Sequence, residues 1–393
     1  MNKKIILFTI LIILLLIISC AEDDIKPDLK DNTEKKPIQD QEKQQVDSQD
    51  GDAMYKRSFS TPQDPEIYLS QVKEESSNTW QYQTTMLTTT EPGNDYDVGA
   101  FCRIFQREDG NYDITYGGSF GQYERDYAGI VHRILNSDFT FTEEDKLFSE
   151  HVTDSAIDSD GEYYYFSKGD PKGWKIEKFD LNFDLVDSVV IELPENHMGN
   201  DQMLRVYNGY VFASGMYDPE YTGERKLHTE DGDIYTHMWI YTNDLEYVND
   251  VMLDDYINSN GETLIYYDGI YAHVTADKFM ESTLIAMLYD EDWNYIETIE
   301  LQDDAQWSMG GQYVDGLIYI AYHKGLHGAG DVFVDIYDTE WNLQETIEVT
   351  NVEQGFNAQR PWIQIYDDKM FVSYDVGDEN AMICLASIYE KAE

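Results

Sequence analysis

The stretch Asp290-Glu291-Asp292-Trp293-Asn294-Tyr295 returns 48 residues later as Asp338-Thr339-Glu340-Trp341-Asn342-Leu343, and this repetition decides the fold. In each copy a strand-like run reaches a short acidic turn, places one large apolar residue and resumes as a second strand. Three less similar copies occur earlier, at 137–141, 181–185 and 243–247. The apolar anchors are spaced 44, 62, 48 and 48 residues apart, and the long interval contains an insertion at about 218–236; these anchors are Phe139, Phe183, Leu245, Trp293 and Trp341.

A second marker recurs in step with the first, a tight turn followed by an aromatic-rich strand. It occurs at 110–112, 161–163, 208–210, 268–270, 315–317 and 367–369. Asp or Asn before Gly is typical of two-residue hairpins, in which the turn residues need positive φ. Six turns at near-constant spacing predict six four-stranded units of roughly 48 residues, which is the size of a propeller blade. The sequence therefore predicts an all-β protein, a β-propeller of six blades, with seven blades as the alternative.

The closure of the ring can also be predicted. The last unit contains only three strand-like runs, near 361–366, 369–375 and 381–389. A spare strand-like run, 80–89, precedes the first unit and would supply the missing fourth strand. Such pairing joins the two ends of the repeat and removes two exposed sheet edges. We expect the blades to occupy about 78–393 within a propeller domain of 59–393.

The N-terminus carries the pattern of an export signal. Lys3 and Lys4 precede an apolar run over 5–18, which is followed by Ser19 and Cys20. A run of roughly 14 residues is short for a membrane span, which needs about 20. The segment 17–20 resembles the lipobox of prokaryotic lipoproteins, which implies a signal peptide over 1–19 and lipidation of Cys20. An ordinary signal peptide or an uncleaved anchor is the alternative.

Composition separates a linker from the folded part and excludes one class of partner. Residues 20–58 begin with the lipidated cysteine and continue as a polar segment with a single aromatic residue, Tyr55, so we expect a disordered linker. The formal net charge of −50 would repel nucleic acid. We expect no cofactor, although calcium binding would be one use of such acidity; a saline habitat or simple solubility are the others.

The folded part resembles, at the level of pattern, the propeller repeats of exported prokaryotic proteins. The turns at 290–293 and 338–341 are also similar to the Asp box of sialidases, but they lack its Ser and Gly, so sialidase activity is not implied. The segment 158–161, Asp-Ser-Asp-Gly, is similar to a calcium loop, yet Tyr163, Tyr164 and Tyr165 stand where oxygen ligands should follow. A hairpin turn is the favoured interpretation there.

Propeller loops that join fourth to first strands, and second to third strands, line one face around the channel. The repeat assigns the first kind to 194–202, 303–310 and 351–361, and the second kind to 119–127, 218–236 and 324–330. The chain has only eight Arg, and four of them fall in or beside these loops. Guanidinium groups can bind a carboxylate bidentately, and Trp can stack on a sugar or aromatic ring. The candidate ligand-binding residues are Arg125, His197, Arg205, Trp307, His323, Arg360 and Trp362; pairing of the arginines with surrounding acids is the alternative.

No cluster of residues with a clear catalytic pattern emerges. His323 and His327 are four residues apart, but nearby glycines argue against a helix and the Glu of a zinc-protease motif is absent, so no metal site is predicted. Two buried free thiols are favoured over a disulfide between Cys102 and Cys384. We therefore expect a binding or scaffolding module for a glycan, a small anionic ligand or an envelope protein. It would be exported and anchored to the cell membrane or outer membrane, on the extracytoplasmic side. A polysaccharide hydrolase or lyase with its site at the channel mouth is the alternative.

Overall fold

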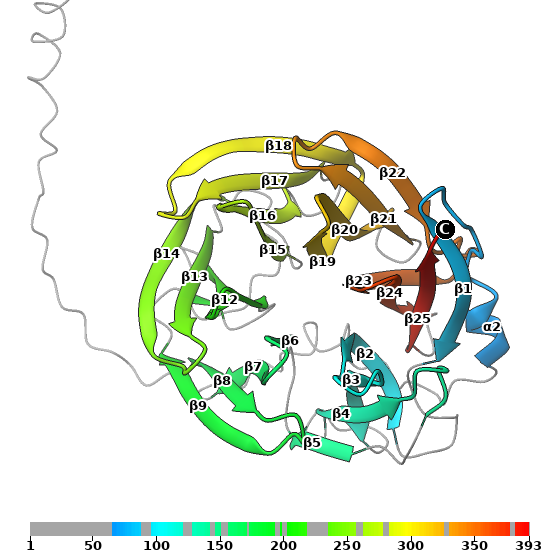
Figure 1. Cartoon of the computed structure of the whole chain (residues 1–393), viewed down its shortest axis with the longest axis horizontal. Helices are drawn as coiled ribbons and strands as arrows, with labels where there is room; N and C mark the ends of the chain where they lie inside the picture. Colours follow the sequence, from blue (N-terminus) through cyan, green and yellow to red (C-terminus); the bar gives the residue numbers. More distant parts are fainter. Residues whose placement is uncertain are drawn as a thin grey trace, which may run out of the picture. The chain divides into compact units, whose positions relative to one another are not determined.

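Six four-stranded antiparallel sheets are arranged as blades around a common axis in the computed structural model, which confirms the six-bladed prediction (Figure 1). The structure describes residues 65–87, 96–120, 128–141, 146–150, 156–170, 173–192, 197–198, 203–217, 235–256, 262–277, 283–325, 330–377 and 382–392. The predicted signal peptide, the predicted lipidation site Cys20 and the predicted linker lie outside these residues. Within them, no helix is long and apolar enough to cross a membrane.

The first three blades follow one another along the chain. Blade 1 contains β2 (Tyr96–Gln106), β3 (Tyr112–Phe120), β4 (Ala128–Leu135) and β5 (Lys146–Glu150). Blade 2 contains β6 (Ala156–Ser159), β7 (Tyr164–Asp170), β8 (Gly173–Phe179) and β9 (Leu185–Glu192). In blade 3 the inner strand is split into β10 (His197–Met198) and β11 (Leu204–Tyr207), which both pair with β12 (Tyr210–Tyr217); β13 (Tyr235–Thr242) and β14 (Tyr247–Tyr256) follow.

The last three blades complete the ring. Blade 4 contains β15 (Glu262–Tyr267), β16 (Ile270–Ala276), β17 (Thr283–Asp290) and β18 (Tyr295–Asp303). Blade 5 contains β19 (Ala305–Val314), β20 (Leu317–Lys324), β21 (Asp331–Asp338) and β22 (Leu343–Glu348). Blade 6 has the order β23 (Asn357–Tyr366), β24 (Lys369–Gly377), β25 (Met382–Lys391) and β1 (Trp80–Leu87).

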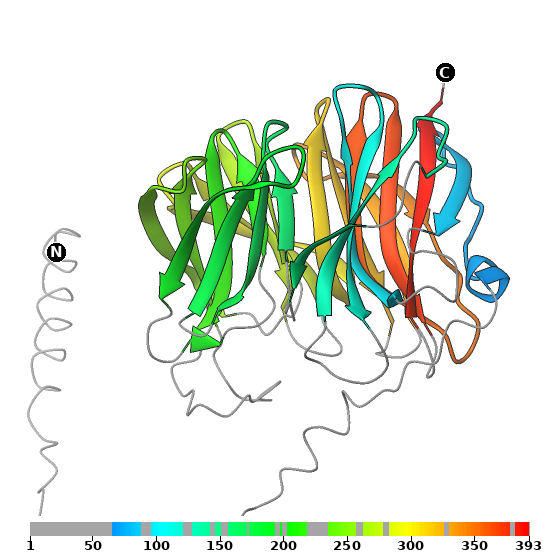
Figure 2. The same cartoon turned by 90° about the horizontal axis from the view of Figure 1, so that it is seen from below.

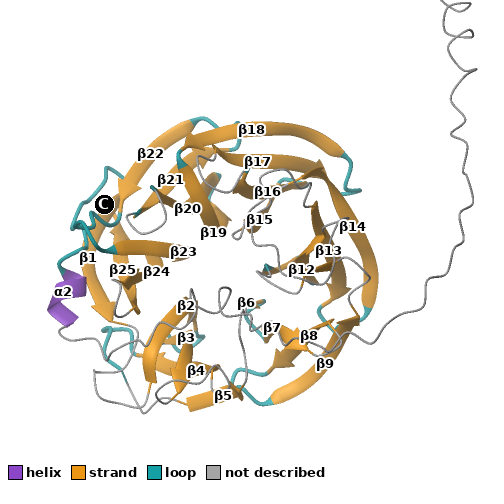
Figure 3. Ribbon diagram, turned by 180° about the vertical axis from the view of Figure 1, so that it is seen from behind, coloured by secondary structure: helices purple, strands orange, loops and turns teal. Residues whose placement is uncertain are grey.

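The predicted closure is confirmed. Strand β1 pairs antiparallel with β25, from Trp80 opposite Lys391 to Leu87 opposite Leu385. Figure 1 shows the blue first strand beside the red last strand, and Figure 3 shows the short helix α2 (Pro65–Leu69) outside the ring next to β1. The outermost strand of blade 6 therefore comes from the other end of the propeller sequence.

The repeated turns have the backbone that their residues predicted. Asn208, Asp268, Asp315 and Asp367 all have positive φ at first-to-second-strand hairpins, and Gly follows the first three of them. All five apolar anchors of the third-to-fourth-strand turns also have positive φ, between 59° and 65°. In these turns an Asp carboxylate accepts backbone N–H groups, as Asp290 does from Asp292 at 3.0 Å and Asn294 at 2.8 Å. This local bond offsets the unfavourable left-handed conformation of the anchor. Figure 2 shows the tight turns together at one end of the strands.

The hydrophobic core is divided among the six seams between blades. One buried cluster lies in each seam, and five of these seams carry at least ten buried apolar residues among those described. The seam between blades 1 and 2 has only five, namely Phe105, Ile157, Tyr164, Phe166 and Phe179. The ring is therefore held together by apolar packing between neighbouring sheets, and among the described residues the seam between blades 1 and 2 has the fewest buried apolar side chains.

Parts of two segments that were expected to be loops belong to strands instead. Residues 305–310 of the expected 303–310 loop belong to β19, and 357–361 of the expected 351–361 loop belong to β23. The reason is that both strands contain β-bulges, between Ser308 and Gly310 and between Gln359 and Trp362, so their pattern does not alternate. Small residues and a proline at these bulges gave the sequence a loop-like character.

Candidate functional site

Side chains from the inner strands of several blades contact one another. Arg103 comes from β2, Asp158 from β6, Arg205 and Tyr207 from β11, and Trp362 from β23. We call these five residues the channel cluster. They come from four different blades and lie within contact of one another, so only the propeller closure brings them together.

Arg205 crosses the centre of the ring. Its Nη2 donates to the carbonyl oxygen of Gly311 in blade 5 at 2.8 Å, and its Nε lies 3.6 Å from Asp158 Oδ2 in blade 2. Its guanidinium carbon is 4.6 Å from the ring centroid of Trp362 in blade 6. Arg205, buried in blade 3, therefore contacts three other blades, which fixes its position.

Tyr207 and Asp158 hold this arginine in place. Arg205 Nε donates to Tyr207 Oη at 3.0 Å, and Tyr207 in turn donates to the carbonyl of Leu264 at 2.8 Å. Asp158 Oδ2 accepts the backbone N–H of Val206 at 2.9 Å. Burial raises the pKa of Asp158, although the positive charge of Arg205 and these hydrogen bonds work in the opposite direction.

Arg103 is the unusual member, because it is buried without a neutralising partner. Only 2% of it is exposed, and its guanidinium carbon lies 3.8 Å from the ring centroid of Trp362. Its Nη1 donates to the carbonyl of Cys102 at 2.9 Å, while among the described residues its Nε has no hydrogen-bond partner and no carboxylate lies within 4.0 Å. Burial lowers the pKa of Arg103 to about 10, and Asp375 and Asp158 counteract this only from a distance.

A strained bulge positions Trp362. Arg360 has a φ of 52°, in the left-handed region, and stands before Pro361 at the β23 bulge. Its guanidinium forms an ion pair with the fully buried Asp375 at 3.2 Å. Bulges of this kind redirect neighbouring side chains and are frequent beside functional sites. The indole Nε1 of Trp362, like the Nε of Arg103, is buried without a hydrogen-bond partner in the described part of the chain.

Two of the three described arginines in and beside the channel cluster form an ion pair with a carboxylate. Arg103, Arg205 and Arg360 bring three positive charges, and Asp158 and Asp375 bring two negative ones. Among the described residues, Arg103 is the arginine of the three that has no carboxylate within 4.0 Å, inside a protein whose formal net charge is −50. A small anion is the chemical species that would balance this centre.

The structure places the expected site residues in several environments. Arg205 and Trp362 belong to the channel cluster, and Arg360 adjoins it. The Trp362 ring, which we expect to offer a stacking face to a ligand, contacts the guanidinium groups of Arg103 and Arg205. His197 forms a 2.8 Å hydrogen bond with His237, and the ring of His323 is buried in β20 against the backbone of Gly330. Arg125 and the side chain of Trp307 lie outside the described part of the chain.

Sequence reasoning missed Arg103 and Asp158. Asp158 was considered only as a possible calcium ligand. Arg103 stands inside the strongly apolar stretch Phe101-Cys102-Arg103-Ile104-Phe105, and a lone arginine there was a usable signal in a chain with eight. The neighbouring Cys102 and Cys384 are buried thiols that form no disulfide with each other, and Cys384 Sγ donates to Asp375 at 3.1 Å.

Comparison with known proteins supports the fold alone. No family model matches the chain, and no curated protein matches it. A neuraminidase-like protein from A/bat/Guatemala/164/2009 is 8% identical, with a TM-score of 0.51 over 79% of this chain and 94% of that one. A Trypanosoma rangeli sialidase is 8% identical, with a TM-score of 0.48 over 77% and 58%. A DUF4221 family member from Bacteroides vulgatus is 8% identical, with a TM-score of 0.45 over 82% and 100%. At such identities a shared propeller does not carry over an activity.

Proposed function

We propose that this protein is an exported, lipid-anchored binding module whose propeller receives a small anionic ligand, of the carboxylate class, at the channel cluster. The observation that carries this proposal is the guanidinium of Arg103, which is buried and has no carboxylate within 4.0 Å among the described residues. An isolated buried charge costs several kcal/mol in a folded protein unless it is paired. A ligand carboxylate would accept hydrogen bonds from the guanidinium and recover part of that cost.

The surroundings of Arg103 support an anion over other ligands. Arg205 supplies a second guanidinium against the same Trp362 ring, and its ties to Asp158, Tyr207 and Gly311 keep it fixed. A site held in advance loses little conformational entropy when its ligand binds. The strongly acidic remainder of the protein would repel anions at long range, so we expect selective binding of modest affinity that strengthens with added salt.

The test is thermal unfolding of the full chain in mild detergent with acetate, citrate and glucuronate, at constant ionic strength set with chloride. A ligand that binds only the folded state stabilises it by about 2.7 kcal/mol at a hundred times its Kd. We expect the melting temperature to rise with carboxylate concentration, and to stop responding in Arg103→Met. The unliganded variant should be at least as stable as the native protein, because a buried unpaired charge is removed.

The matched control is Arg133→Met. Arg133 is a second buried arginine of blade 1, stacked on Phe141 at 3.5 Å, but it lies on the third strand, outside the cluster. This variant should keep the carboxylate response. An equal response in the native protein and in Arg103→Met, or none in the native protein, would overturn the proposal.

Lipid anchoring is tested separately. Cys20→Ser should abolish incorporation of radiolabelled palmitate and move the protein from the membrane fraction to the soluble extracytoplasmic fraction. Retention of label and of membrane association in this variant would exclude Cys20 as the lipidation site. Ligand binding by the propeller should be unchanged.

A further inference from the structure

A cavity of about 450 Å³ opens where the first hairpin of blade 1 faces that of blade 2. Small-molecule sites span roughly 300–1,000 Å³, so this volume is sufficient for a ligand. None of its lining residues belongs to the channel cluster. The lining residues that the argument uses are Gln106, Arg107, Glu108, Asp109, Asp113 and Tyr164.

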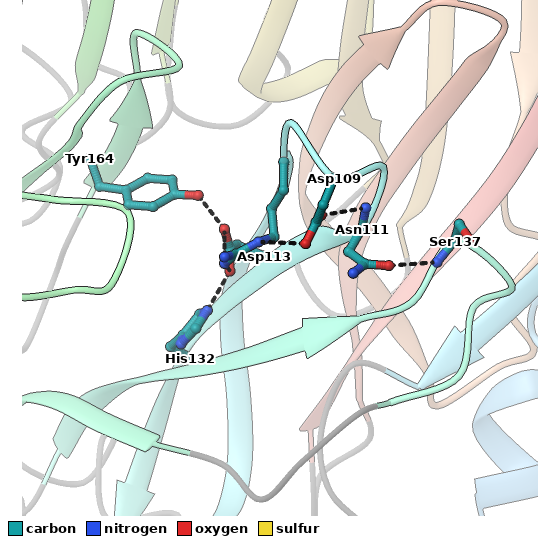
Figure 4. A network of polar contacts seen from close by, with 7 residues as sticks. Asp109, Asn111, Asp113, His132, Ser137 and Tyr164 are labelled. Carbon is teal, nitrogen blue, oxygen red and sulfur yellow. Dashed lines mark hydrogen bonds and ion pairs between the residues drawn. The ribbon is translucent and has the colours of Figure 1, made fainter.

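The cavity lies in the seam between blades 1 and 2, which has the fewest buried apolar residues in the part of the chain that the structure describes. In place of further apolar side chains, this seam has the fully buried carboxylate of Asp113. Asp113 accepts hydrogen bonds from Tyr164 Oη across the seam at 2.5 Å and from His132 Nε2 at 2.6 Å. Figure 4 shows Asp113 at the centre of this network, between Tyr164 and His132.

The network also fixes the wall of the cavity. Arg107 Nη1 donates to both oxygens of Asp113, at 2.8 and 3.1 Å. Phe183 stacks on Tyr164 with ring centroids 4.6 Å apart and an interplanar angle of 12°. The backbone N–H of Ser137 donates to Asn111 at 3.3 Å, which ties the hairpin carrying Arg107 to the next turn of the blade. The polar groups at this wall are therefore held in advance of any ligand.

Several polar atoms of the wall keep hydrogen-bonding capacity. Among the described residues, no protein group accepts a hydrogen bond from Nη2 of Arg107, and the Gln106 amide has no partner. Asp109 Oδ1 accepts the N–H of Asn111 at 3.0 Å, whereas Oδ2 lies 3.8 Å from Arg107 Nε and remains an acceptor. Donors and acceptors thus stand side by side at the rim.

The charges of the wall restrict the ligand class. Glu108 and Asp109 disfavour an anion. The charge of Arg107 is matched by Asp113, and within the described part of the chain no group of three or more His, Cys, Asp or Glu side chains is placed to hold a metal ion. A neutral molecule with neighbouring hydroxyl groups suits this wall, because each hydroxyl can accept from Arg107 or Gln106 and donate to Asp109. We propose that this cavity binds a neutral sugar residue, such as the end of a glycan chain. It would be a second site, independent of anion binding in the channel.

The test is titration calorimetry and saturation-transfer NMR of the full chain with glucose, galactose, mannose and their disaccharides. Asp109→Asn is the most informative variant, because Asp109 is 56% exposed and makes no bond to Asp113. We expect it to weaken sugar binding at least tenfold without lowering the melting temperature. Arg107→Met should abolish binding, and Glu162→Gln, in the neighbouring turn outside the cavity, should leave it unchanged.

The carboxylate site in the channel cluster and the sugar site in the cavity can be tested independently with these variants. Arg103→Met should retain sugar binding, and Asp109→Asn should retain the melting response to carboxylates. Failure of all the neutral sugars to bind at 10 mM would overturn the sugar proposal and leave the anion proposal standing. Equal sugar affinity in Asp109→Asn and the native protein would also overturn it, because the ligand would then lie elsewhere.

Discussion

Trp341 donates its indole N–H to the hydroxyl of Tyr267 across 2.8 Å, and this bond joins blade 5 to blade 4. Trp341 is the apolar anchor of its turn, so the left-handed backbone there directs a large ring into the preceding seam. Trp293 does the same one blade earlier, stacked on Tyr271 at 4.5 Å and also in contact with Phe212 of blade 3. The anchor side chain of the repeated turn thus packs between neighbouring sheets, in addition to the turn reversing the chain.

Truncation of the Trp341 side chain should destabilise the propeller. We expect Trp341→Ala to lower the free energy of unfolding by about 3–5 kcal/mol, as large aromatic truncations in cores do. Trp341→Phe should cost about 1–2 kcal/mol, because it loses the hydrogen bond and some contact while keeping a ring. Urea denaturation followed by circular dichroism measures both.

Leu343→Ala is the control for Trp341→Ala. Leu343 lies two residues further on and is 48% exposed, so the change should be within about 0.5 kcal/mol. If Trp341→Ala were no more harmful than Leu343→Ala, the turn residue would have no part in joining the blades.

The turn residues explain why so much of the fold could be predicted from sequence. Asn208 and Asp268 precede Gly at hairpins, and Asp338 precedes its anchor by three residues; each choice reflects a local backbone requirement. Such local requirements can be recognised from the residue types, and the spacing of these turns predicted the number of blades correctly. The strands β19 and β23 were misplaced at their starts because a bulge depends on the neighbouring blade, which sequence spacing does not encode.

Stability should depend on pH through Glu262. Burial on its own would raise the pKa of this carboxyl, but the charge of His273 and hydrogen bonds from His273, Ser214 and Thr236 overcome it and hold the pKa below the usual 4.5. A lowered folded-state pKa contributes stability above about pH 4.5, and that contribution is lost as pH falls through the folded value.

Glu262→Gln should remove this dependence. We expect the variant to be less stable than the native protein at pH 7, with the difference shrinking as the pH is lowered toward 3. Denaturation midpoints between pH 3 and 7 measure this, with the exposed Glu340→Gln as the control that keeps the native profile. A difference that stayed constant with pH would assign Glu262 a packing role only.

A single glycine permits the close approach of blades 5 and 6 beside the channel cluster. A Cβ on Gly310 would lie 2.5 Å from the backbone nitrogen of Ile363 and 2.7 Å from Cα of Trp362. We expect Gly310→Ala to cost about 2–3 kcal/mol and to remove the carboxylate response, because Trp362 must move. Gly316→Ala should cost about 1–2 kcal/mol through its φ of +82° alone and should keep that response. Retention of the full response in Gly310→Ala would separate Trp362 from ligand binding.

Strand β1, which closes the ring, should be required for cooperative folding, whereas residues 1–58 should not be. Trp80 in β1 is 1% exposed and packs edge-to-face on Tyr319 at 6.2 Å. Deletion through Leu87 would expose the edge of β25, so we expect aggregation and loss of a cooperative melting transition. Deletion through Ser58 should change the melting temperature by less than about 3 °C. Cooperative melting after the longer deletion would contradict the assigned closure.

The site was less predictable than the fold. Arg205 and Trp362 were selected because scarce residue types fell near expected loops, and the structure does bring them together. Arg103 and Asp113 were not selected, because their importance comes from burial between blades and not from a motif. Sequence spacing indicates which strand a residue occupies, but the seam that it faces depends on the twist and bulges of two sheets.

The pairing of β1 with β25 also sets an order of events in folding. Trp80 and Lys391 are partners separated by about 300 residues, a contact of very high sequence separation. Because the chain is synthesised from its N-terminus, β1 stays unpaired until the last strand, β25, has been made. Ring closure is therefore a late step, and the incomplete chain is exposed to proteases and to aggregation until β1 and β25 have paired.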